Sequence, residues 1–297
     1  MNLDYSGDNL VFVVGCPRSG TTWVQRLLAT HPSIRTGQES DLFDLYVGPQ
    51  LRTWRQELTV DSSGRGGVGL GCYFTDAEYQ RVLKEYLLRL LVPMVGELAP
   101  GELFLEKTPS HILYVPEIHA LLPEARFIHV LRDARDTVAS LLSAARGWGR
   151  AWAPRRAANA ASTWVSHVHA ARQAQRLLPE EKFTEVRYEA LHANGPRELG
   201  RLADWLGLSW NAYEVGEALK RNSPEAAKAG SGTPIPLGGQ FGQQLGPTVK
   251  EPPGFIRQAR AGTWRQDLSA TEKLAVWRVA RRTMAQVGYP WAMPWSS

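Results

Sequence analysis

The sequence predicts an α/β fold in three layers, with a central, mainly parallel sheet flanked by helices. Short apolar runs alternate with longer amphipathic runs between residues 10 and 187, and this alternation favours a parallel sheet covered on both faces. The first apolar run leads directly into a glycine-bearing loop and an amphipathic run, which is the order of a phosphate-binding unit. A chain of 297 residues, 43% of them apolar, is long enough for a single domain that spans residues 1–297.

The expected strands are short runs rich in branched and aromatic residues, at 10–14, 103–105, 127–131 and 183–187. Between them, apolar residues recur at helical spacing, which predicts helices at 21–30, 76–95, 112–122, 136–145 and 157–178. The same spacing predicts later helices at 196–206, 213–220 and 270–287. The alternation ends with the last strand, and only helices are expected after it.

Two segments have compositions that oppose a packed element. Residues 61–71 contain five glycines, and residues 231–254 contain six glycines and five prolines. Each is either a plain surface loop or a mobile loop that binds a ligand or covers a binding site as a lid, because long loops inside compact domains are often functional. Aromatic residues that could line a ligand pocket are Trp54, Tyr73, Phe74, Trp148 and Trp152.

Charge and cysteine content narrow the class of protein. The net charge of +5 and the pI near 9.3 come without a dense basic stripe, which suits a small anionic ligand rather than nucleic acid. The two cysteines give neither a disulfide framework nor zinc spacing, so we expect a reducing compartment and a cytoplasmic location. No apolar run reaches membrane-spanning length, and no membrane association is expected.

The most informative segment is 10–28, LVFVVGCPRSGTTWVQRLL. The spacing Gly15-x-x-x-x-Gly20 matches the first part of the Walker A pattern, but Thr21 stands where that pattern has lysine. The cation of this segment is Arg18, inside the loop. The start of the following helix leaves backbone N–H groups unpaired, which favours an anion. The segment therefore predicts a site for a phosphate-like anion, but not the chemistry of an ordinary nucleotide triphosphatase.

A second segment, 127–143, has an apolar strand that ends at Arg132 and a helix that carries Ser140 eight residues later. Ligands of open parallel sheets bind beyond the carboxyl ends of the strands, so these two side chains can meet at one phosphate. Taken alone the segment is ambiguous, because Arg132 and Arg135 could instead form surface ion pairs with Asp133 and Asp136.

Together, the two segments resemble the phosphate sites of the sulfotransferases that use 3′-phosphoadenylyl sulfate (PAPS). The resemblance implies a P-loop-NTPase-like fold and transfer of a sulfuryl group from PAPS to a hydroxyl. It places Arg18 at the oxygen that bridges phosphate and sulfate, and it pairs Arg132 with Ser140 at the 3′-phosphate. The remaining cofactor-binding residues that it implies at this loop are Ser19, Gly20, Thr21, Thr22 and Trp23.

Two further segments resemble the same family more loosely. Residues 183–191, FTEVRYEAL, nominate Tyr188 as a contact of the adenine. Residues 257–268, RQARAGTWRQDL, resemble the C-terminal segment that closes over the 3′-phosphate, which nominates Arg260 and Gly262, with Arg257 as the alternative. The resemblance runs from about residue 10 to residue 268.

Transfer to a hydroxyl needs a general base. Residues 31–40 are similar to a segment of tyrosylprotein sulfotransferases whose Gly-Glu-Glu carries the catalytic glutamate; here it reads Gly37-Gln38-Glu39, which nominates Glu39. His111 is the second candidate, because histidine titrates near neutral pH, and Glu106 is the third. Lys107 resembles a lysine that some members of the family direct at the sulfuryl group.

Nothing in the sequence calls for a metal ion. The rival functions are a P-loop nucleotide kinase or triphosphatase, which lacks its lysine here, and a non-catalytic nucleotide-binding module. The acceptor is expected to be a small molecule or natural product with a hydroxyl, because tyrosylprotein sulfotransferases are membrane-anchored and no anchor is seen in this sequence.

Overall fold

The computed structural model describes residues 3–59, 68–255 and 260–289. Its centre is a five-stranded sheet in the order β2-β3-β1-β4-β5, in which every pair of neighbouring strands is parallel. The strands are β1 (Leu10–Gly15), β2 (Ile34–Thr36), β3 (Leu103–Glu106), β4 (Arg126–Leu131) and β5 (Phe183–Arg187). The predicted fold class is confirmed, and so are the four predicted strands. The edge strand β2 was not predicted, because three residues are too few to show a pattern.

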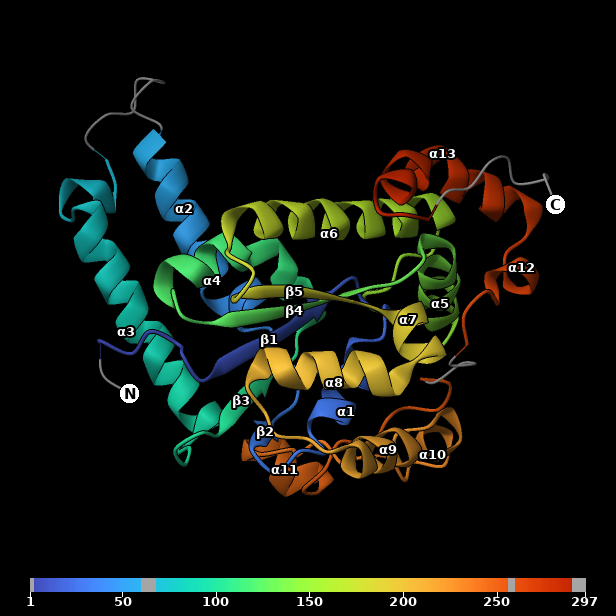
Figure 1. Cartoon of the computed structure of the whole chain (residues 1–297). Coiled ribbons are helices and arrows are strands. Elements are labelled where there is room, and N and C mark those ends of the chain that lie inside the picture. The colour runs from blue at the N-terminus through green and yellow to red at the C-terminus, as the bar shows by residue number, and fades with distance from the viewer. Residues whose placement is uncertain (1–2, 60–67, 256–259, 290–297) are drawn as a thin grey trace.

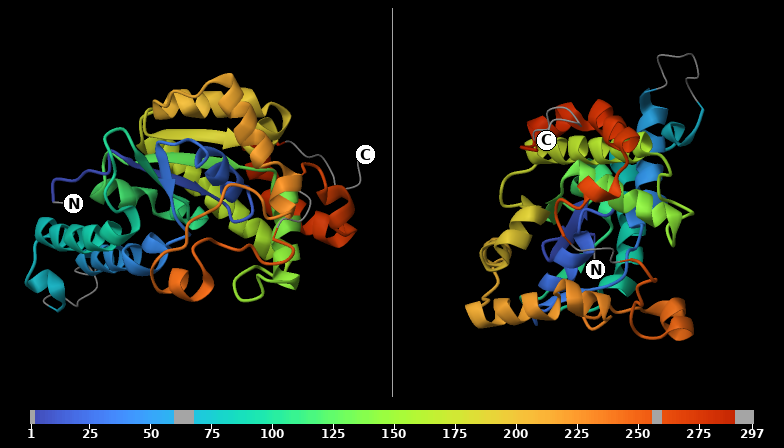
Figure 2. Two further views of the ribbon diagram at one scale, coloured as in Figure 1. Left: turned by 90° about the horizontal axis from the view of Figure 1, so that it is seen from below. Right: turned by 90° about the vertical axis from the view of Figure 1, so that its right-hand side faces the viewer.

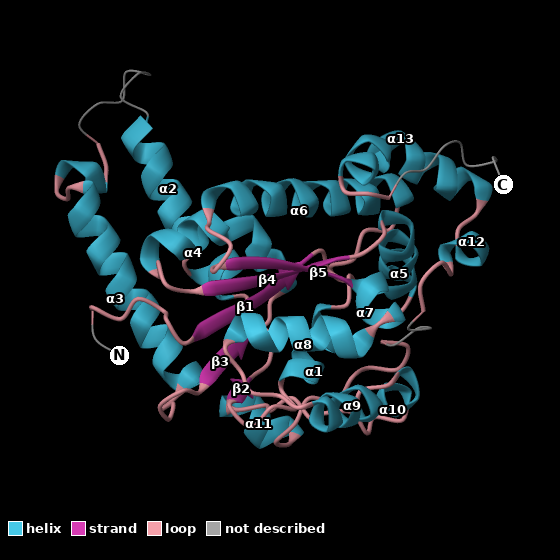
Figure 3. Cartoon of the chain, in the orientation of Figure 1, coloured by secondary structure: helices cyan, strands magenta, loops and turns pink. Residues whose placement is uncertain are grey.

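Helices cover both faces of this sheet, with α4 and α6 on one side and α1 and α8 on the other (Figure 1). All the predicted helices are present, although the one expected at 112–122 begins as a 3-10 helix, Pro109–Tyr114. Figure 3 shows how helices and loops surround the strands. The helices are α1 (Thr21–Leu28), α2 (Gly48–Thr59), α3 (Asp76–Val95), α4 (Val115–Leu121), α5 (Ala134–Arg146), α6 (Ala157–Leu177), α7 (Tyr188–Ala193), α8 (Gly195–Leu206), α9 (Ala212–Arg221), α10 (Pro224–Lys228), α11 (Gly239–Leu245), α12 (Trp264–Asp267) and α13 (Ala270–Gln286).

The side chains of β1 pack alternately on the two faces of the sheet, since successive residues of a strand point in opposite directions. Phe12 and Val14 pack in a cluster with side chains of α3, α4 and α6. Val11 and Val13 pack in a second cluster with α1, α8 and α9. All four are at most 1% exposed, and burial of such a side chain contributes about 1.5–3 kcal/mol to stability. The central strand is thereby held from both sides.

A third cluster joins α5, α6 and α13 at one end of the sheet. Within it, the buried indole of Trp164 on α6 donates a hydrogen bond of 2.8 Å to the carbonyl oxygen of Arg132. This contact fixes the turn between β4 and α5, from which Arg132 extends.

Segment 231–254 contains more structure than its composition predicts. It includes the helix α11 and is closed as a loop by backbone hydrogen bonds from Leu237 to Pro247 (2.8 Å) and from Val249 to Ile235 (2.9 Å). Figure 2 (left) shows this orange segment crossing the blue β1–α1 region, and a contact between Arg26 and Glu251 joins the two. Of the other predicted loop, residues 60–67 lie outside the described residues, and Leu70–Cys72 form a single 3-10 turn.

None of the helices in the described part of the chain has both the length and the apolar character needed to cross a membrane. Both cysteines carry free thiols, with Cys16 buried and Cys72 exposed. The cytoplasmic location remains a prediction from the sequence.

Candidate active site

The carboxyl ends of all five strands meet at one cavity of about 620 Å³. The segment after each strand contributes at least one charged or aromatic side chain to its lining: Glu39 after β2, Lys107 after β3, Arg18 after β1, Arg132 after β4 and Tyr188 after β5. Given the strand order, these side chains follow one another along the sheet edge in that same sequence. This is the position at which open parallel sheets bind their ligands.

The loop between β1 and α1 has the backbone of an anion site. Arg18 adopts a left-handed conformation with φ of 73°, and Gly20 has φ of 106°. A Cβ atom on Gly20 would lie 2.6 Å from the ring of Tyr188, so only glycine fits there. α1 then begins with no side-chain cap and no acidic residue in its first turn, which leaves the positive end of its dipole available to an anion.

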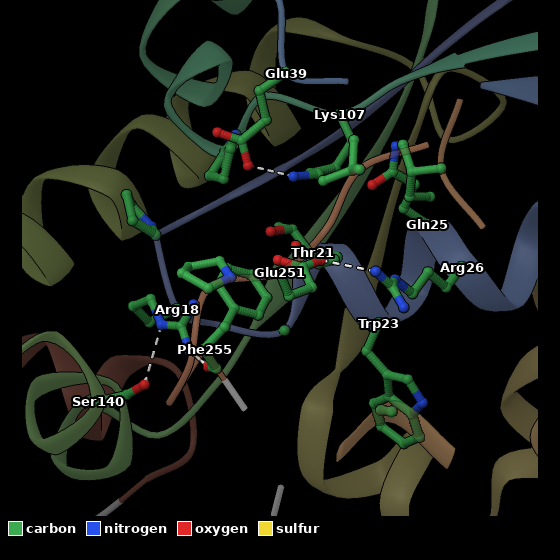
Figure 4. Close-up of a pocket in the computed structure, with 18 of the residues that line it drawn as sticks. Arg18, Thr21, Trp23, Gln25, Arg26, Glu39, Lys107, Ser140, Glu251 and Phe255 are labelled. Carbon is green, nitrogen blue, oxygen red and sulfur yellow. Dashed lines mark hydrogen bonds and ion pairs between the residues drawn. The ribbon is translucent and has the colours of Figure 1, made fainter. Parts of the chain in front are cut away.

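Arg18 lines the cavity beside Ser140 and Phe255 (Figure 4). Its Nε donates to Ser140 Oγ at 3.2 Å, and a terminal nitrogen donates to the carbonyl oxygen of Phe255. The guanidinium lies 4.5 Å from the ring centroid of Phe255 and 5.2 Å from that of Trp148. Ser140 was expected to meet Arg132 at one phosphate; both residues line the cavity, and the hydroxyl of Ser140 accepts a hydrogen bond from Arg18.

Arg132 is 7% exposed and oriented by backbone oxygens. Its two terminal nitrogens donate to the carbonyl oxygens of Arg18 (3.3 Å) and Arg260 (3.0 Å), and its guanidinium lies 4.1 Å from the ring centroid of Tyr188. Its Nε, like the buried Oγ of Ser19, has no hydrogen-bond partner among the described residues. Buried polar atoms are almost always paired, so both atoms are suited to an anionic ligand.

The C-terminal segment is attached to α5 by Asp136, which is 1% exposed. Its carboxylate accepts hydrogen bonds from the N–H groups of Gly262 (2.6 Å) and Trp264 (3.0 Å). Arg260 lines the cavity, whereas Gly262 does not and instead forms this attachment. Arg257 lies outside the described residues.

An aromatic wall closes the β5 end of the cavity. The rings of Trp23 and Tyr188 meet edge to face at 5.4 Å, and His192 lies 5.5 Å from Trp23. The indole N–H of Trp23 donates to the carbonyl oxygen of Asn222 at 3.0 Å. Burial raises the pKa of Tyr188, against the lowering effect of Arg132. His192 and Asn222 were not predicted. His192 lies one helical turn after Tyr188, so helical spacing could have identified it.

At the β2 end, Lys107 forms an ion pair with Glu39 (Figure 4). The lysine side chain is 3% exposed and that of Glu39 is 41% exposed. Gln25 of α1 donates to Thr36 Oγ1 and to the carbonyl oxygen of Gly37, both at 2.8 Å. This helix therefore holds the segment that carries Glu39. Gln25 lines the cavity one turn after Thr21, a spacing that could have identified it.

Thr21 and Thr22 also line the cavity, but His111 and Glu106 do not. His111 is completely buried, with its Nδ1 3.0 Å from Glu106 Oε2 and its Nε2 accepting from Phe43 N–H at 3.1 Å. Burial would lower the pKa of His111, but the Glu106 carboxylate outweighs it and raises that pKa. Burial would raise the pKa of Glu106, but His111 and the surrounding hydrogen bonds hold it at about 2. The structure thus places neither group at the position predicted for the base.

Segment 231–254 and the residues after it form part of the cavity wall. Arg26 of α1 forms a 2.8 Å ion pair with Glu251, whose pKa is raised by burial despite this arginine. Trp148 and Trp152 line the cavity, as the sequence suggested for aromatic residues. Trp54 instead belongs to the core, and neither Tyr73 nor Phe74 lines the cavity. No sequence signal identified Glu251 or Phe255, because both lie in or beside a segment without periodicity.

Within the described ranges, no group of three or more His, Cys, Asp or Glu side chains could hold a metal ion.

A five-stranded parallel sheet flanked by helices, with a glycine-bearing loop between its central strand and the next helix, defines an α/β fold of the P-loop-like class. Residues 10–212 match the sequence profile of the Sulfotransferase family, which is more than half of the chain. The chain belongs to this family, as the motifs at Arg18 and Arg132 predicted.

Sequence relatives are named protein-tyrosine sulfotransferases. A putative protein-tyrosine sulfotransferase of Caenorhabditis briggsae is 31% identical over 135 residues, which is 46% of this chain and 43% of that protein. Human protein-tyrosine sulfotransferase 1 is 29% identical over 137 residues, 45% of this chain and 34% of that protein. The aligned part is thus less than half of each relative.

Solved structures share the fold over nearly the whole chain. The sulfotransferase domain from the curacin biosynthetic pathway superposes with a TM-score of 0.56 at 18% identity, covering 95% of this chain and 98% of that one. Mouse sulfotransferase SULT7A1, complexed with PAP, gives a TM-score of 0.56 at 13% identity, covering 96% and 88%. At such identities the likeness concerns the fold.

Proposed function

We propose that this chain transfers a sulfuryl group from PAPS to the hydroxyl of an acceptor and releases adenosine 3′,5′-bisphosphate. One observation carries the proposal: an arginine, a buried lysine and a carboxylate lie at adjacent strand ends and line one cavity, and they are Arg18, Lys107 and Glu39. The opposite end of the same cavity has Arg132 and an aromatic wall, which suit a phosphorylated nucleoside.

The residues fit the two phosphate groups of PAPS. The start of α1, the unpaired Oγ of Ser19 and the guanidinium of Arg18 would hold the 5′-phosphosulfate. Arg132, with its unpaired Nε, would hold the 3′-phosphate beside Arg260. Trp23 and Tyr188 would contact the adenine.

The transfer would proceed by in-line displacement. The acceptor oxygen forms a bond to sulfur while the bond between sulfur and the 5′-phosphate oxygen breaks, and Glu39 accepts the hydroxyl proton. Arg18 and Lys107 would stabilise the negative charge that grows on the departing oxygen, an effect that acts on the transition state more than on the ground state. As in phosphoryl transfer, positioning and electrostatics would supply most of the rate.

For the acceptor we propose a small molecule or natural product with a hydroxyl. The part of the cavity beside Arg18 has aromatic walls, formed by Trp148, Trp152 and Phe255. A tyrosine of a protein is the second candidate, favoured by the names of the sequence relatives. Labelled PAPS offered with a panel of phenols and alcohols, and separately with tyrosine peptides, distinguishes the two. We further propose that residues 231–254 act as a lid, since Glu251 and Val249 line the cavity.

Ligand titration tests the proposed function directly. Calorimetry should show tight binding of adenosine 3′,5′-bisphosphate and no comparable binding of ATP with Mg²⁺. Tight binding of ATP alone would favour a nucleotide kinase or triphosphatase. Tight binding of the bisphosphate without transfer to any acceptor would favour a non-catalytic binding module.

Arg132→Ala should weaken binding of adenosine 3′,5′-bisphosphate about 10- to 100-fold, since a charge-assisted contact contributes about 1.5–3 kcal/mol. Binding of the 3′-hydroxy analogue should change much less, because that ligand lacks the group that Arg132 is proposed to hold. Arg135→Ala is the matched control, because Arg135 pairs with Asp133 and is absent from the cavity lining. Equal losses for both ligands would show that Arg132 does not bind the 3′-phosphate.

A further inference from the structure

A buried carboxylate lies directly behind the β2 end of the cavity. Glu106, the last residue of β3, is 3% exposed and accepts four hydrogen bonds. Its Oε1 accepts from Ser40 Oγ and Thr108 Oγ1, both at 2.7 Å. Its Oε2 accepts from Thr108 N–H at 3.1 Å and from His111 Nδ1 at 3.0 Å. A buried ionised group is tolerated when it is hydrogen-bonded in this way.

These four bonds join two separate segments of the chain. Ser40 belongs to the segment that follows β2 and is the neighbour of Glu39, whereas Thr108 is the neighbour of Lys107. The two segments also bind each other directly, since Ser40 N–H donates to Thr108 Oγ1 at 3.1 Å. The immediate neighbours of both proposed catalytic side chains are therefore tied to one carboxylate.

His111 extends the same network. Phe43 N–H donates to Nε2 of His111, and this contact needs the neutral ring with its hydrogen on Nδ1, where it is donated to Glu106. The contact opposes the protonation that the raised pKa of His111 favours. A proton on Nε2 would oppose the Phe43 N–H, although Asp44 lies 3.5 Å away and could accept it. In the form that fits, His111 links Glu106 to the backbone three residues beyond Ser40.

We propose that Glu106 is a positioning residue that fixes Glu39 and Lys107 relative to each other by binding both of the segments that carry them. The proposal rests on the proposed sulfuryl transfer, in which Glu39 and Lys107 act on the same reacting group. Glu39 is 41% exposed, so its own contacts leave it freedom that the network removes. Glu106 itself stays out of the cavity and does not touch the ligands.

Glu106→Gln tests this with almost no change in volume. In one orientation the new NH₂ group faces two donors, Thr108 N–H and His111 Nδ1. In the other it faces the hydroxyls of Ser40 and Thr108, which donate to Glu106 and already accept from Leu42 N–H and Ser40 N–H. We expect kcat to fall about 10- to 100-fold, the effect of displacing a catalytic group by about 1 Å. Binding of adenosine 3′,5′-bisphosphate should stay within about twofold, since the network makes no contact with Arg18 or Arg132.

Glu117→Gln is the matched control. Glu117 is also a buried glutamate, 6% exposed, but it pairs with Arg52 and Arg55 outside the cavity. We expect this variant to lose stability without losing kcat. Equal losses of kcat in the two variants would reduce the role of Glu106 to general stability and overturn the proposal.

Hydrogen–deuterium exchange gives a readout that does not depend on turnover. In Glu106→Gln the amides of Ser40, Phe43 and Thr108 should exchange faster, while those of the loop at Gly20 should not change. An inactive wild-type protein would contradict the sulfuryl transfer, whereas an active wild type with unchanged kcat and exchange in the variant would contradict only the role of Glu106.

Thr108→Val is a second variant that keeps the shape of the side chain, for use if Glu106→Gln does not fold. It removes one donor to Glu106 and the acceptor of Ser40 N–H. We expect a fall in kcat of about 3- to 10-fold with unchanged binding of the bisphosphate. A kcat equal to that of the wild type would contradict the proposal.

Discussion

Replacing Glu39 with alanine is expected to lower turnover about 10²- to 10⁴-fold, the range that a general base contributes. The carboxylate of Glu39 faces the cavity and pairs with Lys107, so it is the proposed acceptor of the hydroxyl proton. The binding of adenosine 3′,5′-bisphosphate should be retained, because the proposed contacts of the bisphosphate come from the other strands. Single-turnover transfer of labelled sulfate, together with calorimetry of the bisphosphate, measures both quantities.

Gln38→Ala is the control for this substitution, because Gln38 is the neighbour of Glu39, lines the same cavity and carries no charge. Glu39→Gln adds a second comparison, since it keeps the size of the side chain and removes its basicity. Near-normal turnover in Glu39→Ala would remove Glu39 as the base and promote His111, despite its burial.

Replacing Arg18 with alanine is expected to lower kcat about 10²- to 10³-fold, the loss seen when one preorganised donor to a developing charge is removed. The guanidinium is held by Ser140 and Phe255 and lies against the rings of Phe255 and Trp148, so little reorganisation is needed when charge develops. Steady-state kinetics that separate kcat from KM measure this effect.

Arg18→Lys keeps the positive charge but loses the planar fork, so we expect an intermediate kcat. Arg155→Ala is a control for the loss of one positive charge, because Arg155 is exposed and outside the cavity lining. If the loss in Arg18→Ala lay entirely in KM, with kcat unchanged, Arg18 would bind the ligand uniformly and would have no catalytic role.

The fold was largely predictable because its determinants are local. The strands β1 and β4 are apolar runs ended by glycine or arginine, and the amphipathic pattern of α3 is preceded by Thr75 in a capping box. The strand β2 was not predicted, because Ile34–Thr36 is too short to show a sequence pattern. Its place in the sheet comes from pairing with β3.

The candidate site was most predictable where a strand and its following loop carry the signal. Arg18, Arg132 and Lys107 all follow strands and line the cavity together. The places of Ser140 and Glu251 depend on contacts between residues far apart in the chain, such as that of Glu251 with Arg26. Such contacts come from packing, which leaves no spacing in the sequence.

The order of the strands places Glu39 and Tyr188 at opposite edges of the sheet. β2, which leads to Glu39, is an edge strand of three residues with one neighbour, and β5, which leads to Tyr188, is the opposite edge. With neighbouring strands about 4.8 Å apart, the two margins are about 19 Å apart. Insertions and exchanges at the β2 margin would leave the β4 and β5 end intact. The proposed base and the proposed nucleotide contacts therefore depend on opposite margins of the sheet and can change separately.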